Sequence, residues 1–70
     1  MDSKFTAVIQ KDGNWWIGWV EEVPGVNAQE ATREDLLESL GLALKDILEL
    51  NRQDARKAMT GDYEEVQISA

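Results

Sequence analysis

The chain opens with two short segments in which apolar and polar side chains alternate. Phe5 to Gln10 repeats with a period of two, which is the period of a half-buried β-strand. Trp15 to Val20 is rich in the aromatic and β-branched residues that strands favour. Between them lies Asp12-Gly13, a pair that favours the backbone angles of a two-residue hairpin loop. The pattern therefore predicts a β-hairpin.

The length of the loop decides which side chains share a face of this hairpin. A two-residue loop at Asp12-Gly13 sets Ile9 opposite Trp16 and gives one wholly apolar face. That face holds Phe5, Ala7, Ile9, Trp16, Gly18 and Val20, and the mixed face holds Thr6, Val8, Gln10, Trp15, Ile17 and Trp19. A three-residue loop would exchange the faces of the tryptophans, because a slip of one residue turns a strand over. We favour the two-residue loop, since it gives one clean core face on which Gly18 would let a helix approach closely.

A third strand and a long helix are expected after the hairpin. Pro24 cannot donate to a ladder, so the second strand ends before it, and Val26 to Glu30 alternates as a short third strand. Thr32 is a typical N-cap, and Asp35 stands at the capping-box position three residues later. Apolar residues at helical spacing then form one broad face. They are Leu36, Leu37, Leu40, Ala43, Leu44, Ile47, Leu48 and Leu50.

The sequence leaves two alternatives for the end of the helix. The helical phase continues through Ala55–Met59 with Gly61 as a C-terminal cap, or the helix breaks near Asn51-Arg52 and a loop follows. Tyr63 to Ser69 alternates again and predicts a final strand. The expected fold is α+β in the order β-β-β-α-β, a small antiparallel sheet with one long helix packed on one face. Met1 to Ser3 is expected to be a short polar lead.

Size and charge narrow the class of protein. Seventy residues allow one domain with a marginal core, which usually needs disulfides, a metal or oligomerisation. Cysteine and histidine are absent, which excludes disulfides and a zinc site and leaves a homodimer or higher homo-oligomer. The net charge of −7 disfavours direct binding of nucleic acid. No apolar run reaches the length of a membrane span and no signal peptide is present, so we expect a cytoplasmic protein.

No catalytic motif is found along the chain. Without histidine or cysteine, a nucleophile lacks its usual base, and the five glycines have no phosphate-binding spacing. We therefore expect no enzyme, no cofactor and no metal, with a carboxylate-dependent metal nuclease as the weakest hypothesis. The outer sheet face instead predicts a contact surface for a partner or a second copy. Its candidate residues are Val8, Trp15, Ile17 and Trp19, joined by Leu42, a leucine on the polar face of the helix.

Three motifs occur in a recognisable order. They are Trp16-Ile17-Gly18 as an aromatic-x-small element, Val23-Pro24-Gly25-Val26 as a loop step, and Thr32-Arg33-Glu34-Asp35 as a helix cap. Over roughly residues 4 to 50 the chain resembles the N-terminal domain of the HicB-like antitoxin family. It departs from that family at Glu21, where proline is frequent, at Val26, where cysteine is frequent, and near Glu30, where glycine is frequent.

The resemblance implies a degenerate ribonuclease-H-like layer without catalysis. Such a domain binds and blocks a small basic RNA-cleaving toxin of the HicA type, and residues 1–70 would form it without a C-terminal DNA-binding module. Acidic residues on the helix would then face the toxin, namely Glu34, Asp35 and Glu38. The alternative is a solitary homo-oligomeric domain with no toxin partner.

Overall fold

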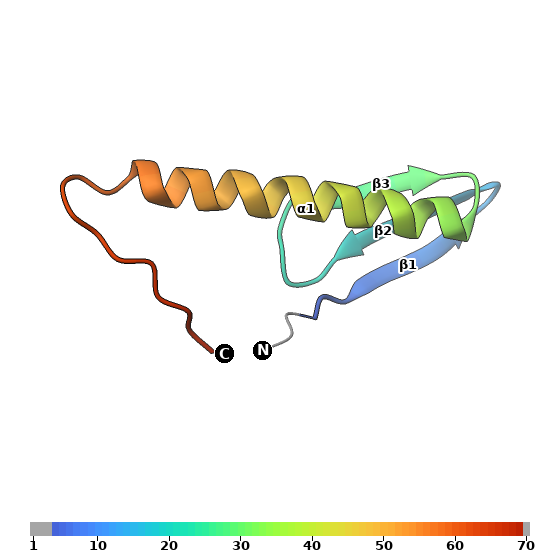
Figure 1. Cartoon of the computed structure of the whole chain (residues 1–70). Helices are drawn as coiled ribbons and strands as arrows, with labels where there is room; N and C mark the ends of the chain where they lie inside the picture. The colour runs from blue at the N-terminus through green and yellow to red at the C-terminus, as the bar shows by residue number, and fades with distance from the viewer. Residues whose placement is uncertain (1–3, 70) are drawn as a thin grey trace.

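The computed structural model describes residues 4 to 69, so the expected polar lead at Met1 to Ser3 lies outside the described part. Three strands form one antiparallel sheet in the order β1-β2-β3, and one long helix crosses one face of it (Figure 1). The bounds are β1 Ala7–Asp12, β2 Trp15–Val20, β3 Asn27–Glu30 and α1 Arg33–Lys57. This arrangement confirms the α+β class and the β-β-β-α order, with the helix on one face.

The hairpin turns at Gly13-Asn14, one residue later than expected. Asp12 pairs with Trp15 across a two-residue loop, and Gly13 has a φ of 60°. A glycine with positive φ at the first loop position is typical of a type II′ turn. All pairings shift by two, so that Ile9 lies opposite Gly18. Because two is the period of a strand, every side chain keeps its predicted face.

The helix begins where its cap predicts. The Thr32 hydroxyl oxygen accepts a hydrogen bond from the backbone N–H of Asp35 at 3.1 Å, and its carbonyl accepts from Leu36 at 3.0 Å. The first bond satisfies an N–H group that lacks an intrahelical partner, and the second is the first backbone hydrogen bond of the helix. The acidic residues Glu34 and Asp35 lie in the first turn, where the helix dipole favours negative charge.

The end of the chain differs from the prediction. The helix passes Asn51 without a break and ends at Lys57, and Gly61, with a φ of 78°, lies beyond its C-cap. Residues 63–69 form no strand in the described part of the chain, so the expected final strand is wrong. The helix extends nine residues past Leu48, the last one that packs on the core. It therefore carries the following segment about 13 Å further along its axis.

The core lies between the first half of α1 and the inner face of the sheet. Its buried side chains are Val20, Val23, Val26, Leu36 and Leu40. Partly buried residues pack around them, namely Ile9, Trp16, Ala28, Ala43, Leu44, Ile47 and Leu48. A Cβ on Gly18 would lie 3.1 Å from Leu40 Cδ1, which confirms that this glycine permits the close approach of the helix.

Four residues expected on apolar core faces are exposed instead. They are Phe5, Ala7, Leu37 and Leu50. The contacts of α1 are mainly with β2 and β3, so Phe5 and Ala7 at the start of β1 and the adjoining helix flank at Leu37 lie open. Leu50 lies beyond the core residues of the helix. The apolar face predicted for the helix is thus wider and longer than the part of the sheet that it covers.

The loop after β2 closes one end of the core. Gly25 has a φ of 88° directly after Pro24, the arrangement of a type II turn with proline first and glycine second. This turn directs Val23 and Val26 inward, where both are buried. Sequence reasoning treated this loop as a strand terminator, although it supplies two of the most buried side chains.

Candidate protein-binding surfaces

The outer face of the sheet carries an exposed apolar patch. Val8 pairs with Trp19 across the hairpin, and Trp15 and Ile17 lie on the same face of β2. We call Val8, Trp15, Ile17 and Trp19 the outer patch. Val8, Trp15 and Trp19 are 51%, 49% and 53% exposed, and Ile17 between them is half-buried. The four predicted residues therefore meet on one face, opposite the helix.

Leu42, the fifth predicted contact residue, lies on the helix rather than on the sheet. It is 60% exposed on α1, which is the other layer of the fold. The prediction that it points away from the core is consistent with this exposure. It does not join the outer patch, because the sheet lies between the helix and that patch.

The predicted acidic residues lie on the first two turns of α1. Glu34, Asp35 and Glu38 are all exposed. The start of the helix and the hairpin turn lie at the same end of the molecule (Figure 1). Trp15, the outer-patch residue next to that turn, thus lies towards the end that carries the acidic residues.

A shallow groove of about 160 Å³ lies between β1 and the helix. Its lining is almost wholly apolar: Phe5, Ala7, Val20, Leu37, Leu40, Gly41 and Leu44. We call this the β1 groove. Sequence reasoning assigned all of these residues except Gly41 to the core and missed the groove, because the periodicity of a helix does not tell how many strands the helix will cover.

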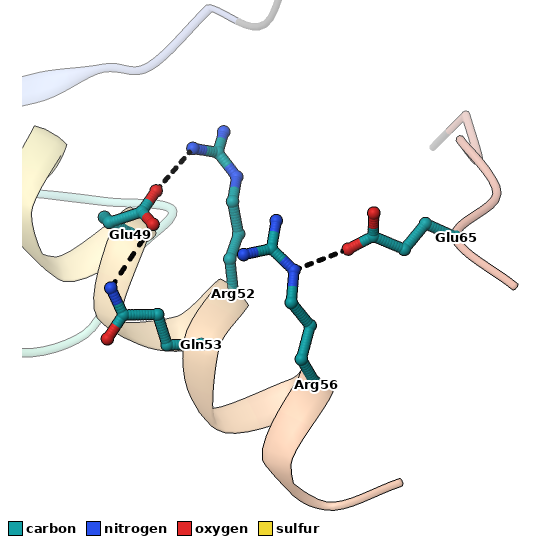
Figure 2. A network of polar contacts seen from close by, with 5 residues as sticks. All are labelled: Glu49, Arg52, Gln53, Arg56 and Glu65. Atoms are coloured by element: carbon teal, nitrogen blue, oxygen red, sulfur yellow. Dashed lines mark hydrogen bonds and ion pairs between the residues drawn. The ribbon is translucent and has the colours of Figure 1, made fainter. Parts of the chain in front are cut away.

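A polar network joins the end of the helix to the segment that follows (Figure 2). Glu49 accepts hydrogen bonds from Arg52 at 3.5 Å and from Gln53 at 3.4 Å, and Arg56 Nε donates to the Glu65 carboxylate at 2.7 Å. The hydrogen bond and the negative charge of Glu65 raise the pKa of Arg56. Both ion pairs are exposed, so solvent screens them and each contributes little to stability.

A second hollow of about 470 Å³ lies beside this network. It is lined by Arg52, Ala55, Arg56, Met59, Tyr63, Glu64 and Glu65. Every one of these residues is exposed. The hollow is therefore the space between the last helical turns and an extended segment rather than an enclosed cavity.

Two polar contacts near β1 were not predicted. The Glu22 carboxylate accepts the backbone N–H of Thr6 at 2.7 Å, which lowers the pKa of Glu22. The Lys11 ammonium lies 6.0 Å from the centre of the Trp16 ring, a weak cation–π contact. Lys11 and Trp16 are cross-strand partners in the observed register, so the shift of the turn explains why this pair was missed.

Residues 4 to 69 contain neither a candidate metal site nor a membrane-spanning helix. Within that range no three acidic side chains converge as a metal site would require. Across the same residues, no helix combines the length and apolar character needed to cross a membrane. No known protein family, curated protein or solved structure matches the chain.

Proposed function

We propose that this chain is a non-enzymatic protein-binding domain of the antitoxin type, which blocks a small basic RNA-cleaving toxin in the cytoplasm. The observation that carries the proposal is the outer patch. Its two tryptophans and Val8 are each about half exposed on one sheet face. Aromatic residues are enriched in protein–protein interfaces, and contiguous exposed apolar surface usually marks one.

The charge of the chain indicates the chemistry of the partner. With 14 acidic and 7 basic residues the net charge is −7. Exposed Glu34, Asp35 and Glu38 add negative charge at the end of the molecule that also carries Trp15. A basic protein would be attracted to this end, and complementary charge chiefly raises the association rate. Inhibition would be steric, with the domain covering the surface on which the toxin binds RNA.

The order of elements supports the same proposal. The resemblance to HicB-like antitoxins implies a small antiparallel layer with a threonine-capped helix, and β-β-β-α with Thr32 at the cap is compatible with that layer. The resemblance rests on the motifs quoted above. The outer patch and the charge are independent of it.

The experiment is an RNA-cleavage assay with a HicA-type toxin, taken from a neighbouring reading frame where one is encoded. We expect stoichiometric addition of the chain to abolish cleavage and coexpression to restore growth. Undiminished cleavage, with the two proteins separate in sedimentation, would contradict the proposal.

A charge series sharpens this assay. Replacing Glu34→Gln together with Glu38→Gln removes two charges without altering shape, and we expect a slower association and a weaker salt dependence. Asp46→Asn with Asp54→Asn, also exposed on α1, removes the same charge further along the helix and serves as the matched control. An equal effect of both pairs would mean that the partner responds to net charge alone.

The second candidate is a solitary domain whose outer patch pairs two copies of this chain. The exposed tryptophans favour it as they favour a toxin interface. Replacing Trp15→Glu and Trp19→Glu should then reduce the sedimenting mass to that of the single chain. An unchanged mass would remove the outer patch from any contact between copies.

A further inference from the structure

We propose that two copies of this chain exchange their C-terminal segments, with residues 63–69 of one copy forming a strand along the free edge of β1 in the other. The proposal does not depend on a toxin. It rests on an open strand edge, an open groove beside that edge, and a strand-like segment that stays unpaired within its own chain.

The edge of β1 is free to accept a strand. In the sheet order β1-β2-β3, β1 has one neighbour. The Thr6 carbonyl accepts the N–H of Glu21, so the peptide of Thr6 faces β2. Because the peptide groups of a strand alternate in direction, those of Ala7 and Ile9 point to the open edge. Such a row of unpaired donors and acceptors is a template for another strand.

The β1 groove offers a place for apolar side chains next to that edge. Phe5 and Ala7 line it from the sheet, and Leu37, Gly41 and Leu44 line it from the helix. The groove exists because α1 packs mainly on β2 and β3 and leaves Phe5 and Ala7 exposed. A strand added to β1 would place alternate side chains over this groove.

Residues 63–69 have the pattern such a strand needs. Val66 and Ile68 alternate with Glu65 and Gln67, and these two apolar side chains are 73% and 89% exposed. The segment is extended, and it is held to the helix by the exposed ion pair between Arg56 and Glu65. A contact this exposed is weak, so the segment can leave its position readily.

Residues 63–69 cannot all lie along β1 of their own chain while α1 keeps its length. Phe5 and Leu44 line the same groove, and from Leu44 to Lys57 the helix rises roughly 20 Å. The segment must return by that distance and also cross from the helix layer to the sheet. Lys57 and residue 63 are six steps apart and at most about 21 Å from each other when the chain is fully extended. Once the step between the layers is added, residue 63 does not reach the start of β1, and only the residues after it can.

A second copy removes this restriction, and the charge of the segment is complementary to that of the lysines near β1. A segment that arrives from another chain is not tied to the end of this helix. Glu64 and Glu65 make the segment acidic, whereas Lys4 precedes β1 and Lys11 lies near its end. Each copy carries both an open edge and an unpaired segment, so one two-fold axis satisfies both contacts at once.

The test is the sedimenting mass of matched variants. We expect the unaltered chain to be a dimer, and Val66→Asp with Ile68→Asp to give a folded monomer, since both side chains are exposed in the single chain. Gln67→Asp with Ser69→Asp adds the same charge to the alternate side of the segment and should stay dimeric.

The substitution Gly41→Glu should block the β1 groove from its helix side. The position has open space around it on the helix, and replacing a helical glycine does not weaken the helix. We expect this variant to be a monomer. Mixing it with the Val66→Asp, Ile68→Asp chain should restore a heterodimer, because one chain keeps an intact segment and the other an intact groove.

Four outcomes would overturn the proposal. They are a monomeric unaltered chain, a dimer that survives both sets of changes, a mixture that forms no heterodimer, and dissociation by Trp15→Glu and Trp19→Glu. The last would place the contact between copies at the outer patch. A monomer whose Ala7 and Ile9 amides resist hydrogen exchange would mean that the segment occupies its own β1.

Discussion

The two faces of the sheet share the same strands but differ in what covers them. On the inner face, Gly18 is so close to the helix that an added Cβ would meet Leu40 Cδ1 at 3.1 Å. One residue further along β2, Trp19 is 53% exposed on the outer face. Two of the three tryptophans, Trp15 and Trp19, thus lie where the described chain offers little cover.

This contrast separates folding from binding. The inner face stabilises the domain, because burial removes apolar area from water. The outer face makes no comparable contribution within the single chain, so its tryptophans suit contact with another molecule. Substitutions on the inner face should change stability, and those on the outer face should change association.

The largest expected effect is that of Leu36→Ala on the inner side of the helix. Leu36 is fully buried, and such truncations cost about 2–5 kcal/mol. Leu42→Ala, at a position 60% exposed on the same helix, is the control and should change the free energy of unfolding by less than about 0.5 kcal/mol. Urea unfolding measures both. Equal costs would mean that α1 does not pack on the sheet as described.

Gly18→Ala should have the next largest effect on stability. The added Cβ would lie 2.9 Å from Ile9 Cγ2 and 3.1 Å from the carbonyl oxygen of Val8, and overpacking of this kind costs about 1–3 kcal/mol. Gly41→Ala has open space around the new methyl group and should stabilise the helix by up to about 1 kcal/mol. The two thermal midpoints should therefore move in opposite directions. A shift of the same sign would contradict the close approach at Gly18.

The costs in stability of Trp16→Ala and Trp19→Ala should differ by a smaller amount, but this difference tests the assignment of the two faces directly. Trp16 is half-buried against the core under Lys11, whereas Trp19 is exposed opposite Val8. We expect Trp16→Ala to destabilise by about 2 kcal/mol, roughly half the cost of a fully buried tryptophan. Trp19→Ala should cost at most about 1 kcal/mol, the scale of one cross-strand pair. A larger cost at Trp19 would reverse the assignment of faces.

The smallest expected effect on stability is that of Glu22→Gln, and it depends on pH. The N–H of Thr6 lowers the pKa of Glu22 from its ordinary value of 4.5. The ionised carboxylate therefore stabilises the fold above pH 4.5, and this contribution is lost as the pH falls through the lowered pKa of the folded state. In acid titrations followed by circular dichroism, Glu22→Gln should be less stable than the unaltered chain near neutral pH. The difference should disappear in strong acid, and a difference that grows there would contradict the contact.

The periodicity of the sequence predicted most of the fold. Alternation identified the strands, Thr32 identified the start of the helix, and the period of two kept the tryptophans on the correct faces. The turn was misplaced by one residue because Asp12-Gly13 and Gly13-Asn14 are both acceptable two-residue loops. The faces survived because the resulting shift in pairing was an even number of residues.

What the sequence could not predict depends on distances between elements. Alternation in residues 63–69 favours a strand, but it does not tell whether a free edge lies within reach of a helix that continues to Lys57. The β1 groove was missed for a similar reason, because the width of the apolar face of α1 does not tell how many strands it covers. The inward positions of Val23 and Val26 follow from a turn with Gly25 at positive φ.

One variant measured in two ways tests the separation of the two faces most directly. Trp19→Glu places a charge within the outer patch without touching the buried core. We predict that its free energy of unfolding stays within about 1 kcal/mol of the unaltered chain and that inhibition of a HicA-type toxin is lost. A variant that unfolds, or one that inhibits as well as the unaltered chain, would contradict the account.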